Sequence, residues 1–208
     1  LRIPSTQLYT SPPPRRGISW GPNNTLATVG KTNIYLWNIG GGHIIRRLGY
    51  YMSHVVDIEC SPDGRYVACL SNDATIHIWD TSTLQEIAII RAPKPLNQIK
   101  WSPNYRYIAG SSKNHIYLWE IREMKLYKKI KCRNIISTTW NPSGEKIAYS
   151  SKRGLHIYDV ERDELQIVHL NVGYLENLSW SPNGKYIAAI VEPKTISIID
   201  TDKWREIH

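Results

Sequence analysis

Residues 61–80 read SPDGRYVACLSNDATIHIWD, and this segment contains the clearest signals of the fold. It opens with Ser-Pro-Asp-Gly, in which proline and glycine stand where a tight turn needs them. A run rich in apolar residues follows, then a short polar turn, and then an alternating run that ends at Trp79-Asp80. Short runs of this kind between turn signals predict two strands of an antiparallel sheet.

The same pattern recurs through the chain. The proline of the turn returns at steps of 40, 41, 39 and 40 residues, as Pro22, Pro62, Pro103, Pro142 and Pro182. The end of the alternating strand keeps the same phase, at Trp37-Asn38, Trp79-Asp80, Trp119-Glu120, Tyr158-Asp159 and Ile199-Asp200. Two landmarks in phase over five copies indicate an internal repeat.

Each repeat reads as four short strands. In the last copy the first strand is Asn177–Trp180 and the second is KYIAAIV, and in earlier copies segments such as HIIRRL and EIAII supply a fourth strand. Four antiparallel strands every ~40 residues are the signature of a propeller blade. We therefore predict an all-β fold, a β-propeller with five visible repeats, which is either a closed five-bladed ring or part of a larger or open one.

The repeats resemble those of WD-repeat proteins, and the resemblance covers about nine-tenths of the chain, from Ile18 to the end. The Ser61–Gly64 turn and the Ile76–Asp80 strand match the family pattern closely. In that family an Asp six residues before the Trp usually anchors a network of hydrogen bonds with His, Ser or Thr, and Trp. Asp73 alone has this offset here, so the resemblance implies a diverged member of the family.

The repeats set the expected domain organisation. We expect a Pro-rich linker or closing segment at residues 1–16 and a propeller at residues 17–208. Its repeats are expected at about 17–53, 54–96, 97–134, 135–175 and 176–208. The absence of an initiator Met suggests a piece of a longer protein or a processed one.

Gly30-Lys31-Thr32 resembles the end of a nucleotide-binding phosphate loop. Such a loop also needs a Gly five residues earlier and a helix after it, whose N-terminus binds phosphate. Position 25 is Thr, and the strand-like NIYLWN follows the triplet. The triplet is therefore interpreted as the turn between the second and third strands of repeat 1.

The same turn is basic in several repeats. In an up-and-down blade, the second-to-third turns and the blade-to-blade connections lie at one end. The cations expected there are Lys31, Lys113, Lys152, Lys194, Arg91, Lys131 and Arg133. We predict that they form a basic face for an acidic partner, either nucleic-acid phosphate or an acidic protein. The alternative is that lysine serves only as a soluble turn residue.

Other prominent residues are interpreted as structural. The cluster from Lys125 to Arg133 along the outer strand of repeat 3 is typical of a guard against edge-to-edge pairing of sheets. Seven of the eight Trp residues are in phase with the repeat and are predicted to pack between blades. His77 and His156 share one repeat position with Tyr and Ser, which favours a structural role over a ligand set.

The composition limits the other function classes. The chain has 208 residues and a net charge of +8. Its three Cys lack zinc-binding spacing, so we expect free buried thiols and a reducing cytoplasmic location, or a nuclear one in a eukaryote. We expect no metal and no cofactor. No apolar run reaches the ~18 residues of a membrane span.

The favoured function is a non-catalytic scaffold or recognition module for protein partners, in an assembly or in a longer chain. The alternative is an RNA- or nucleic-acid-binding propeller that uses the basic face. An enzyme of a propeller hydrolase class is a third option, and it needs converging acids or metal ligands that the sequence does not supply locally.

Overall fold

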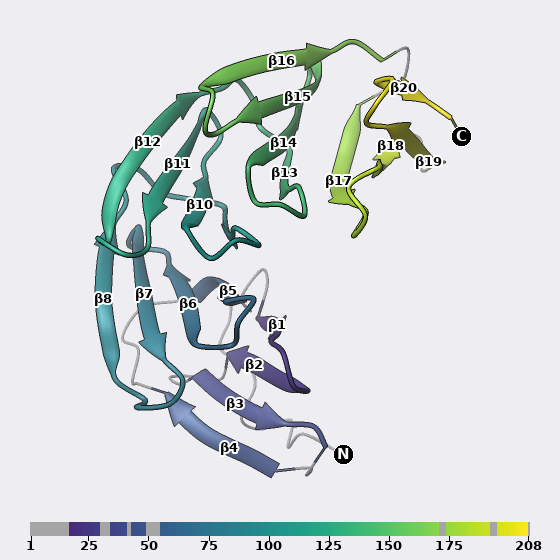
Figure 1. Ribbon diagram of the computed structural model, residues 1–208. Coiled ribbons are helices and arrows are strands. Elements are labelled where there is room, and N and C mark those ends of the chain that lie inside the picture. The colour runs from purple at the N-terminus through teal and green to yellow at the C-terminus, as the bar shows by residue number, and fades with distance from the viewer. Residues whose placement is uncertain are drawn as a thin grey trace.

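The computed structural model describes residues 17–29, 34–40, 43–48, 55–170, 174–191 and 195–207. Every regular element in these residues is a strand, and the strands form five four-stranded antiparallel sheets. Within each sheet the strands follow one another in sequence order, so one repeat forms one sheet. Figure 1 shows the five sheets side by side along a curved arc, as in a β-propeller. The predicted all-β propeller fold is confirmed.

The strands have the following bounds. Blade 1 contains β1 (Ile18–Trp20), β2 (Thr25–Val29), β3 (Ile34–Asn38) and β4 (His43–Leu48). Blade 2 contains β5 (Val55–Cys60), β6 (Tyr66–Ser71), β7 (Thr75–Asp80) and β8 (Glu86–Arg91). Blade 3 contains β9 (Gln98–Trp101), β10 (Tyr107–Ser111), β11 (His115–Glu120) and β12 (Lys125–Lys131). Blade 4 contains β13 (Ser137–Trp140), β14 (Lys146–Ser151), β15 (Gly154–Asp159) and β16 (Glu164–Val168). Blade 5 contains β17 (Leu175–Trp180), β18 (Tyr186–Val191), β19 (Thr195–Asp200) and β20 (Arg205–Glu206).

The second strands of the middle blades are the most buried elements. Every residue of β10 is buried, and so are five of the six residues in β6 and in β14. The fourth strands β12 and β16 are mostly exposed. A strand that lies between two neighbouring blades is covered on both faces, which explains its almost continuous apolar sequence.

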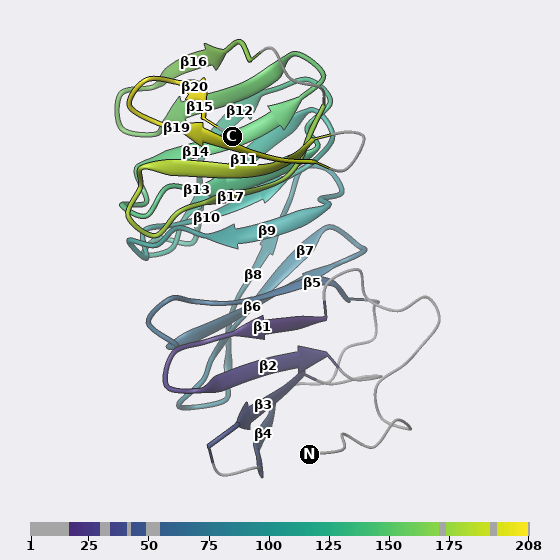
Figure 2. The same ribbon diagram turned by 90° about the vertical axis from the view of Figure 1, so that its right-hand side faces the viewer.

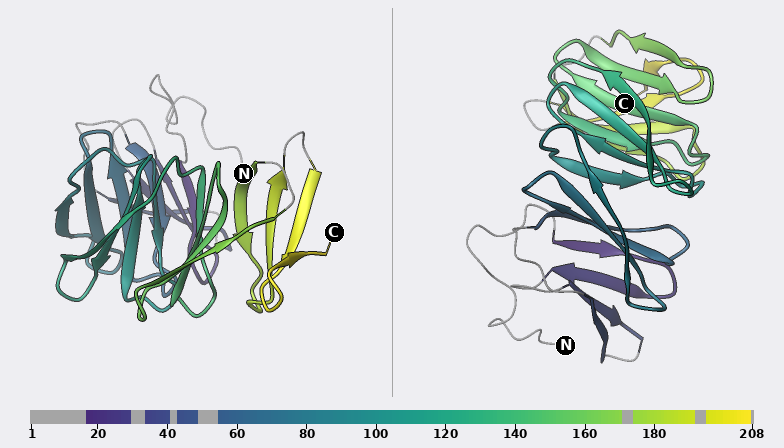
Figure 3. Two further views of the ribbon diagram at one scale, coloured as in Figure 1. Left: turned by 90° about the horizontal axis from the view of Figure 1, so that it is seen from above. Right: turned by 90° about the vertical axis from the view of Figure 1, so that its left-hand side faces the viewer.

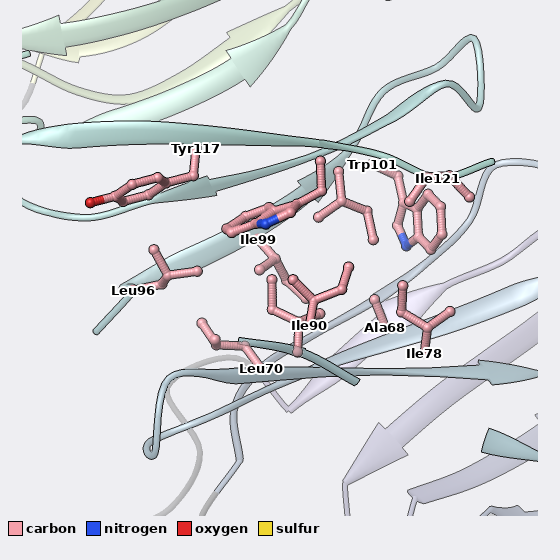
Figure 4. Close-up of a cluster of buried hydrophobic side chains, with 12 residues drawn as sticks. Ala68, Leu70, Ile78, Ile90, Leu96, Ile99, Trp101, Tyr117 and Ile121 are labelled. Carbon is pink, nitrogen blue, oxygen red and sulfur yellow. The ribbon is translucent and has the colours of Figure 1, made fainter. Parts of the chain in front are cut away.

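In the described residues the hydrophobic core forms four clusters, each between two neighbouring blades. Figure 4 shows the cluster between blades 2 and 3, where Leu70 and Ile78 lie against Ile99 and Trp101. Burial of one such side chain contributes about 1.5–3 kcal/mol relative to exposure. Because each blade packs only on its neighbours, the fold is held together blade by blade.

Hydrogen bonds also join the inner strands of neighbouring blades. Asp57 is 1% exposed, and its Oδ2 accepts a hydrogen bond of 3.0 Å from the backbone N of Ile99, 42 residues away. The Oγ of Ser137 likewise accepts a 3.0 Å bond from the backbone N of Leu178, 41 residues away. Both separations are about one repeat, so the bonds tie blade 2 to blade 3 and blade 4 to blade 5.

The two end blades lack a described neighbour on one side. The arc of described blades is open between blade 5 and blade 1, as the views in Figures 1 and 3 show. Trp20 of blade 1 is 61% exposed, whereas Trp101, its counterpart in blade 3, is 5% exposed. Ile196 of blade 5 is 64% exposed, against 0% for its counterpart Ile76 in blade 2. The prediction that the phased Trp residues pack between blades is therefore wrong for Trp20, since no described blade covers its face.

Candidate binding surface at one end of the propeller

The two ends of the propeller consist of different loops. We call the end with the second-to-third turns and the blade-to-blade connections the connection end, and the opposite end the turn end. In Figure 2 the strands run across the view, with the turn end on the left. At each end, neighbouring loops are joined by backbone hydrogen bonds. At the connection end the backbone N of Cys132 donates to Asn114 O (2.9 Å). At the turn end the backbone N of Ile121 donates to Arg106 O (2.9 Å).

Five of the seven predicted binding residues lie in the described part of the chain. All five have exposed side chains at the connection end: Arg91, Lys113, Lys131, Arg133 and Lys152. The other two, Lys31 and Lys194, lie outside the described residues, as does the triplet that resembles a phosphate loop. The up-and-down topology therefore brings together cations from three different blades.

These cations are not neutralised within the described part of the chain. None of the five forms an ion pair with a described carboxylate, and neither does the neighbouring Arg153. At the turn end, by contrast, some cations are paired: Arg106 Nη1 lies 2.5 Å from Glu161 Oε1. Within the described residues, these cations of blades 3 and 4 thus face solvent without an ion-pair partner, and the acid Asp73 stands at the same end in blade 2.

Strand β12 contains both kinds of charge. It is the outer edge strand of blade 3, the position at which lysine was expected to prevent edge pairing. Toward the turn end, Lys125 pairs with Glu123 (3.3 Å) and Lys128 pairs with Asp163 (2.6 Å). Toward the connection end, the described residues contain no ion-pair partner for Lys131. The lysines of this strand therefore fall into a paired and an unpaired group.

A histidine reports the positive potential of the connection end. His115 is the first residue of β11 and pairs with Lys131 of β12. Partial burial lowers the pKa of His115, and the charges of Lys129, Lys94 and Lys131 lower it further. Several lysines therefore act on the same point, which is the electrostatic condition for attracting an anion.

Two cavities lie on either side of the connection between blades 3 and 4. One, of about 330 Å³, is lined by Asn114, His115, Lys131, Cys132, Arg133 and Asn134. The other, of about 280 Å³, is lined by Lys131, Cys132, Arg133, Tyr149, Ser151, Arg153, His156, Leu165 and Ile167. They share the Lys131–Arg133 segment, which places two predicted cations on both. Arg153 joins these cations, although the repeat pattern did not indicate it.

A third cavity lies on the inner, concave side of the arc. It has about 340 Å³ and is lined by inner-strand residues of blades 3, 4 and 5: Gln98, Lys100, Ser137, Thr138, Thr139, Asn177, Leu178 and Ser179. Lys100 Nζ is 2.6 Å from Glu59 Oε2, so its charge is paired. This inner surface is polar but does not share the unpaired charge of the connection end.

The Asp, Thr and His of the network that the family resemblance implies are in contact along the strands of blade 2. Asp73 Oδ1 accepts a 3.0 Å hydrogen bond from the backbone N of Thr75. The Oγ1 of Thr75 is 2.9 Å from His77 Nε2, and His77 Nδ1 is 2.5 Å from Glu86 Oε1. The chain of contacts thus runs from the second-to-third turn to the outer strand β8.

The cysteines behave as the sequence predicts. Cys60, Cys69 and Cys132 are buried and form no disulfide, and burial raises the pKa of Cys60 to about 11. No group of three or more His, Cys, Asp or Glu with a metal-binding arrangement occurs in the described ranges. Those ranges also contain no helix of the length and hydropathy that crossing a membrane requires.

The fold has clear counterparts among solved structures. A chain of "Crystal Structure of Mitotic Checkpoint Complex" superposes with a TM-score of 0.80 and 15% identity, over 93% of this chain and 62% of that one. A chain of "Kuenenia stuttgartiensis Hydrazine Synthase" gives a TM-score of 0.75 and 17% identity, over 96% of this chain and 66% of that one. With its repeats and five four-stranded blades, this protein is a WD-repeat β-propeller.

The particular family follows from the sequence comparison. Residues 22–153, more than half of the chain, match the family described as "Eukaryotic translation initiation factor eIF2A", and the chain belongs to this family. It is also 25% identical over 189 residues to a subunit of eukaryotic translation initiation factor 3 from Aedes aegypti. That match covers 84% of this chain but 27% of the relative, so the chain spans about a quarter of the relative's length.

Proposed function

We propose that this protein is a non-catalytic interaction module of a multi-subunit assembly in translation initiation, and that the connection end is its docking surface. The observation that carries this proposal is the group of five exposed cations without an acidic partner among the described residues. Charges left uncompensated on one surface steer and select partners of opposite charge. The family match, and the fact that the Aedes aegypti relative is a subunit of an initiation factor, support an assembly of this kind.

The proposal includes the two predicted residues outside the described part. Lys31 and Lys194 belong to the same type of turn as Lys113 and Lys152, so they extend the docking surface to blades 1 and 5. The proposed location is the cytoplasm, where initiation factors act, and the proposed partners are proteins with an acidic surface. The proposed function requires no cofactor or metal.

The experiment that tests this proposal compares the two ends. The tagged full-length protein is purified from its own cells, treated with nuclease and analysed by mass spectrometry. One variant reverses three charges at the connection end (Lys113→Glu, Lys131→Glu, Lys152→Glu), and its matched control reverses three at the turn end (Lys125→Glu, Lys185→Glu, Lys203→Glu). We expect a set of initiation proteins that survives nuclease, is lost with the first variant and is kept with the second. Equal partner sets for the two variants would overturn the proposal.

Binding of RNA is the second candidate, and the same cations favour it. Neutralisation of phosphates by Lys and Arg releases counterions, so RNA affinity would fall steeply with salt. If the protein binds RNA, the partners that co-purify with it should be lost after nuclease treatment. Salt titration of a labelled RNA oligonucleotide then separates the candidates.

Catalysis is not part of the proposal. The propeller fold alone does not exclude it, because one of the similar structures is that of a hydrazine synthase. Hydrolysis, however, requires converging acids, a nucleophile with its base, or metal ligands. The described connection end instead gathers Lys and Arg side chains.

A further inference from the structure

Two histidines occupy the same position in blades 2 and 4, and their surroundings differ. His77 pairs with Ile89 across β7 and β8, and His156 pairs with Ile167 across β15 and β16. The repeat pattern favours a structural role for both. The pairing of β7 with β8 shifts in register between Ile78 and Trp79, whereas the pairing of β15 with β16 has no shift. Both histidines nevertheless stand opposite an isoleucine of the outer strand, so the side chains around them can be compared.

Blade 2 supplies a carboxylate to its own histidine. His77 Nδ1 lies 2.5 Å from Glu86 Oε1. Glu86 stands opposite Trp79 in the register, and the residue opposite Tyr158 in blade 4 is Leu165. Blade 4 therefore has an aliphatic side chain where blade 2 has an acid.

The consequence for His156 is an unpaired ring nitrogen. His156 is 5% exposed, and its Nε2 is 2.8 Å from Ser151 Oγ. Its Nδ1 is buried and has no hydrogen-bond partner among the described residues. Such an atom costs about 1–3 kcal/mol relative to a bonded one. Burial lowers the pKa of His156, and the charges of Arg153 and His169 lower it further.

The surroundings of His156 attract negative charge and also offer an apolar surface. His156 lines the cavity of about 280 Å³ between blades 3 and 4, together with Lys131, Arg133 and Arg153. No acid is among the described residues that line this cavity. Leu165 and Ile167 complete the wall and are 47% and 43% exposed. The site thus combines three unpaired cations with an exposed aliphatic edge.

We propose that this cavity binds an acidic peptide segment of a partner protein, with a carboxylate held by the three cations and apolar side chains on Leu165 and Ile167. The incoming acid supplies from outside the negative charge that Glu86 supplies inside blade 2. The exposed lining favours peptide over RNA, because bases stack on exposed aromatic rings and the aromatic lining residue, Tyr149, is 2% exposed. This inference rests on the proposed function, since it gives the chemistry of the segment that docks at the connection end.

The test uses the full-length protein and a synthetic probe. The probe is a fluorescein-labelled nine-residue peptide of alternating Glu and Leu, and its binding is followed by fluorescence anisotropy. Arg153→Glu and Lys131→Glu are each expected to weaken binding about tenfold or more, since each replaces an attraction by a repulsion. A second peptide, with Gln in place of Glu, is expected to bind at least tenfold more weakly than the first.

One variant introduces an acid of the protein's own into the cavity between blades 3 and 4. Leu165→Glu places in blade 4 the acid that blade 2 has at this register position, so we expect it to occupy the cations and remove peptide binding. Because residue 165 is exposed, this variant should fold normally, and NMR should show the pKa of His156 raised. Ile167→Asp tests the apolar edge, and Ile89→Asp at the same register position of blade 2 is its matched control. Lys125→Glu, at the far end of β12, is the control for charge.

Several results would overturn the inference. They are equal affinity for the Glu and Gln peptides, unchanged peptide binding in Leu165→Glu, and tighter binding of a single-stranded RNA oligonucleotide that is lost in the same variants. If the peptide does not bind while a nuclease-resistant assembly still depends on Lys113 and Lys152, the inference about the cavity is wrong and the proposed function is supported. If the peptide binds as expected but no such assembly forms, binding of acidic peptides at the cavity is supported and the proposed function is wrong.

Discussion

At the turn end of this propeller Arg106 is paired with Glu161 and Lys128 with Asp163, whereas at the connection end Lys131 and Arg133 have no acidic partner among the described residues. The turn end is also closely packed from blade to blade. A Cβ added to Gly144 in the Ser-Gly turn of blade 4 would lie 2.6 Å from Asn104 Cγ in the turn of blade 3. Side chains at the turn end thus contact the neighbouring blade, whereas Lys131 and Arg133 at the connection end face solvent.

The largest expected effect comes from breaking the packing of the turn end. Gly144 has a φ of 73°, and a Cβ there would also come within 2.8 Å of the backbone N of Asn104. Gly144→Ala should therefore lower the free energy of unfolding by about 3 kcal/mol, from the left-handed backbone and the clash together. Urea denaturation followed by circular dichroism measures the change.

Gly184→Ala is the matched control for this prediction. Gly184 has a φ of 75°, but its nearest contact for an added Cβ is Pro142 Cδ at 3.8 Å. Only the backbone conformation is strained there, so we expect a loss of about 1 kcal/mol. Equal losses for the two variants would show that the turns of neighbouring blades do not depend on this contact.

The next effect concerns two exposed lysines of the connection end. The double variant Lys113→Glu, Lys152→Glu should reduce co-purified partner about tenfold at physiological salt. Because both side chains are exposed, the free energy of unfolding should change by less than about 0.5 kcal/mol. Quantitative mass spectrometry and urea denaturation test the two statements. A large loss of stability would mean that these lysines belong to the framework rather than to the surface.

A smaller effect concerns the pH dependence of the turn end. The hydroxyl of Ser82 and the backbone N of Thr83 donate to Asp80, and these bonds lower the pKa of Asp80 from 3.8 to about 2. The folded pKa lies below the unfolded one, so the stabilisation is present above about pH 4 and is lost as the pH falls toward 2. Asp80→Ala should flatten the change in urea midpoint over this window. An unchanged slope would contradict the prediction.

The smallest expected effect is at the ion pair itself. The side chains of Arg106 and Glu161 are 52% and 47% exposed, so water screens their attraction. Arg106→Ala should cost less than about 1 kcal/mol, and a double-mutant cycle with Glu161→Ala should give a coupling energy in the same range. A coupling of several kcal/mol would mean that paired charges, and not only packing, hold the turn end together.

Much of the fold and part of the site were predictable from the sequence. The 40-residue period and the alternating strands predicted the blades, and the end of the third strand at Asp80 and Asp159 is found where expected. These Asp side chains also have a local role, since Asp159 Oδ1 accepts from the backbone N of Arg162 in the following turn. Signals of this kind are short-range, so a sequence contains them fully.

The rest depends on contacts across blades. Nothing in the sequence places Asp163 beside Lys128, or Arg153 beside Lys131, because these partners meet only when blade 4 packs on blade 3. The same reason explains why Trp20 is exposed although its repeat position predicts burial.

The blade, its strand order and the end of the propeller to which each turn belongs follow from the sequence, since an antiparallel hairpin fixes these locally. Five predicted cations therefore lie at one end, as the repeat phase required. The packing of the blades sets which charges are paired and which faces are covered. It also forms the cavity at His156, where Leu165 rather than an acid stands opposite Tyr158. Pairing and burial arise between segments one repeat apart, and the distances that decide them exist only once the blades have packed.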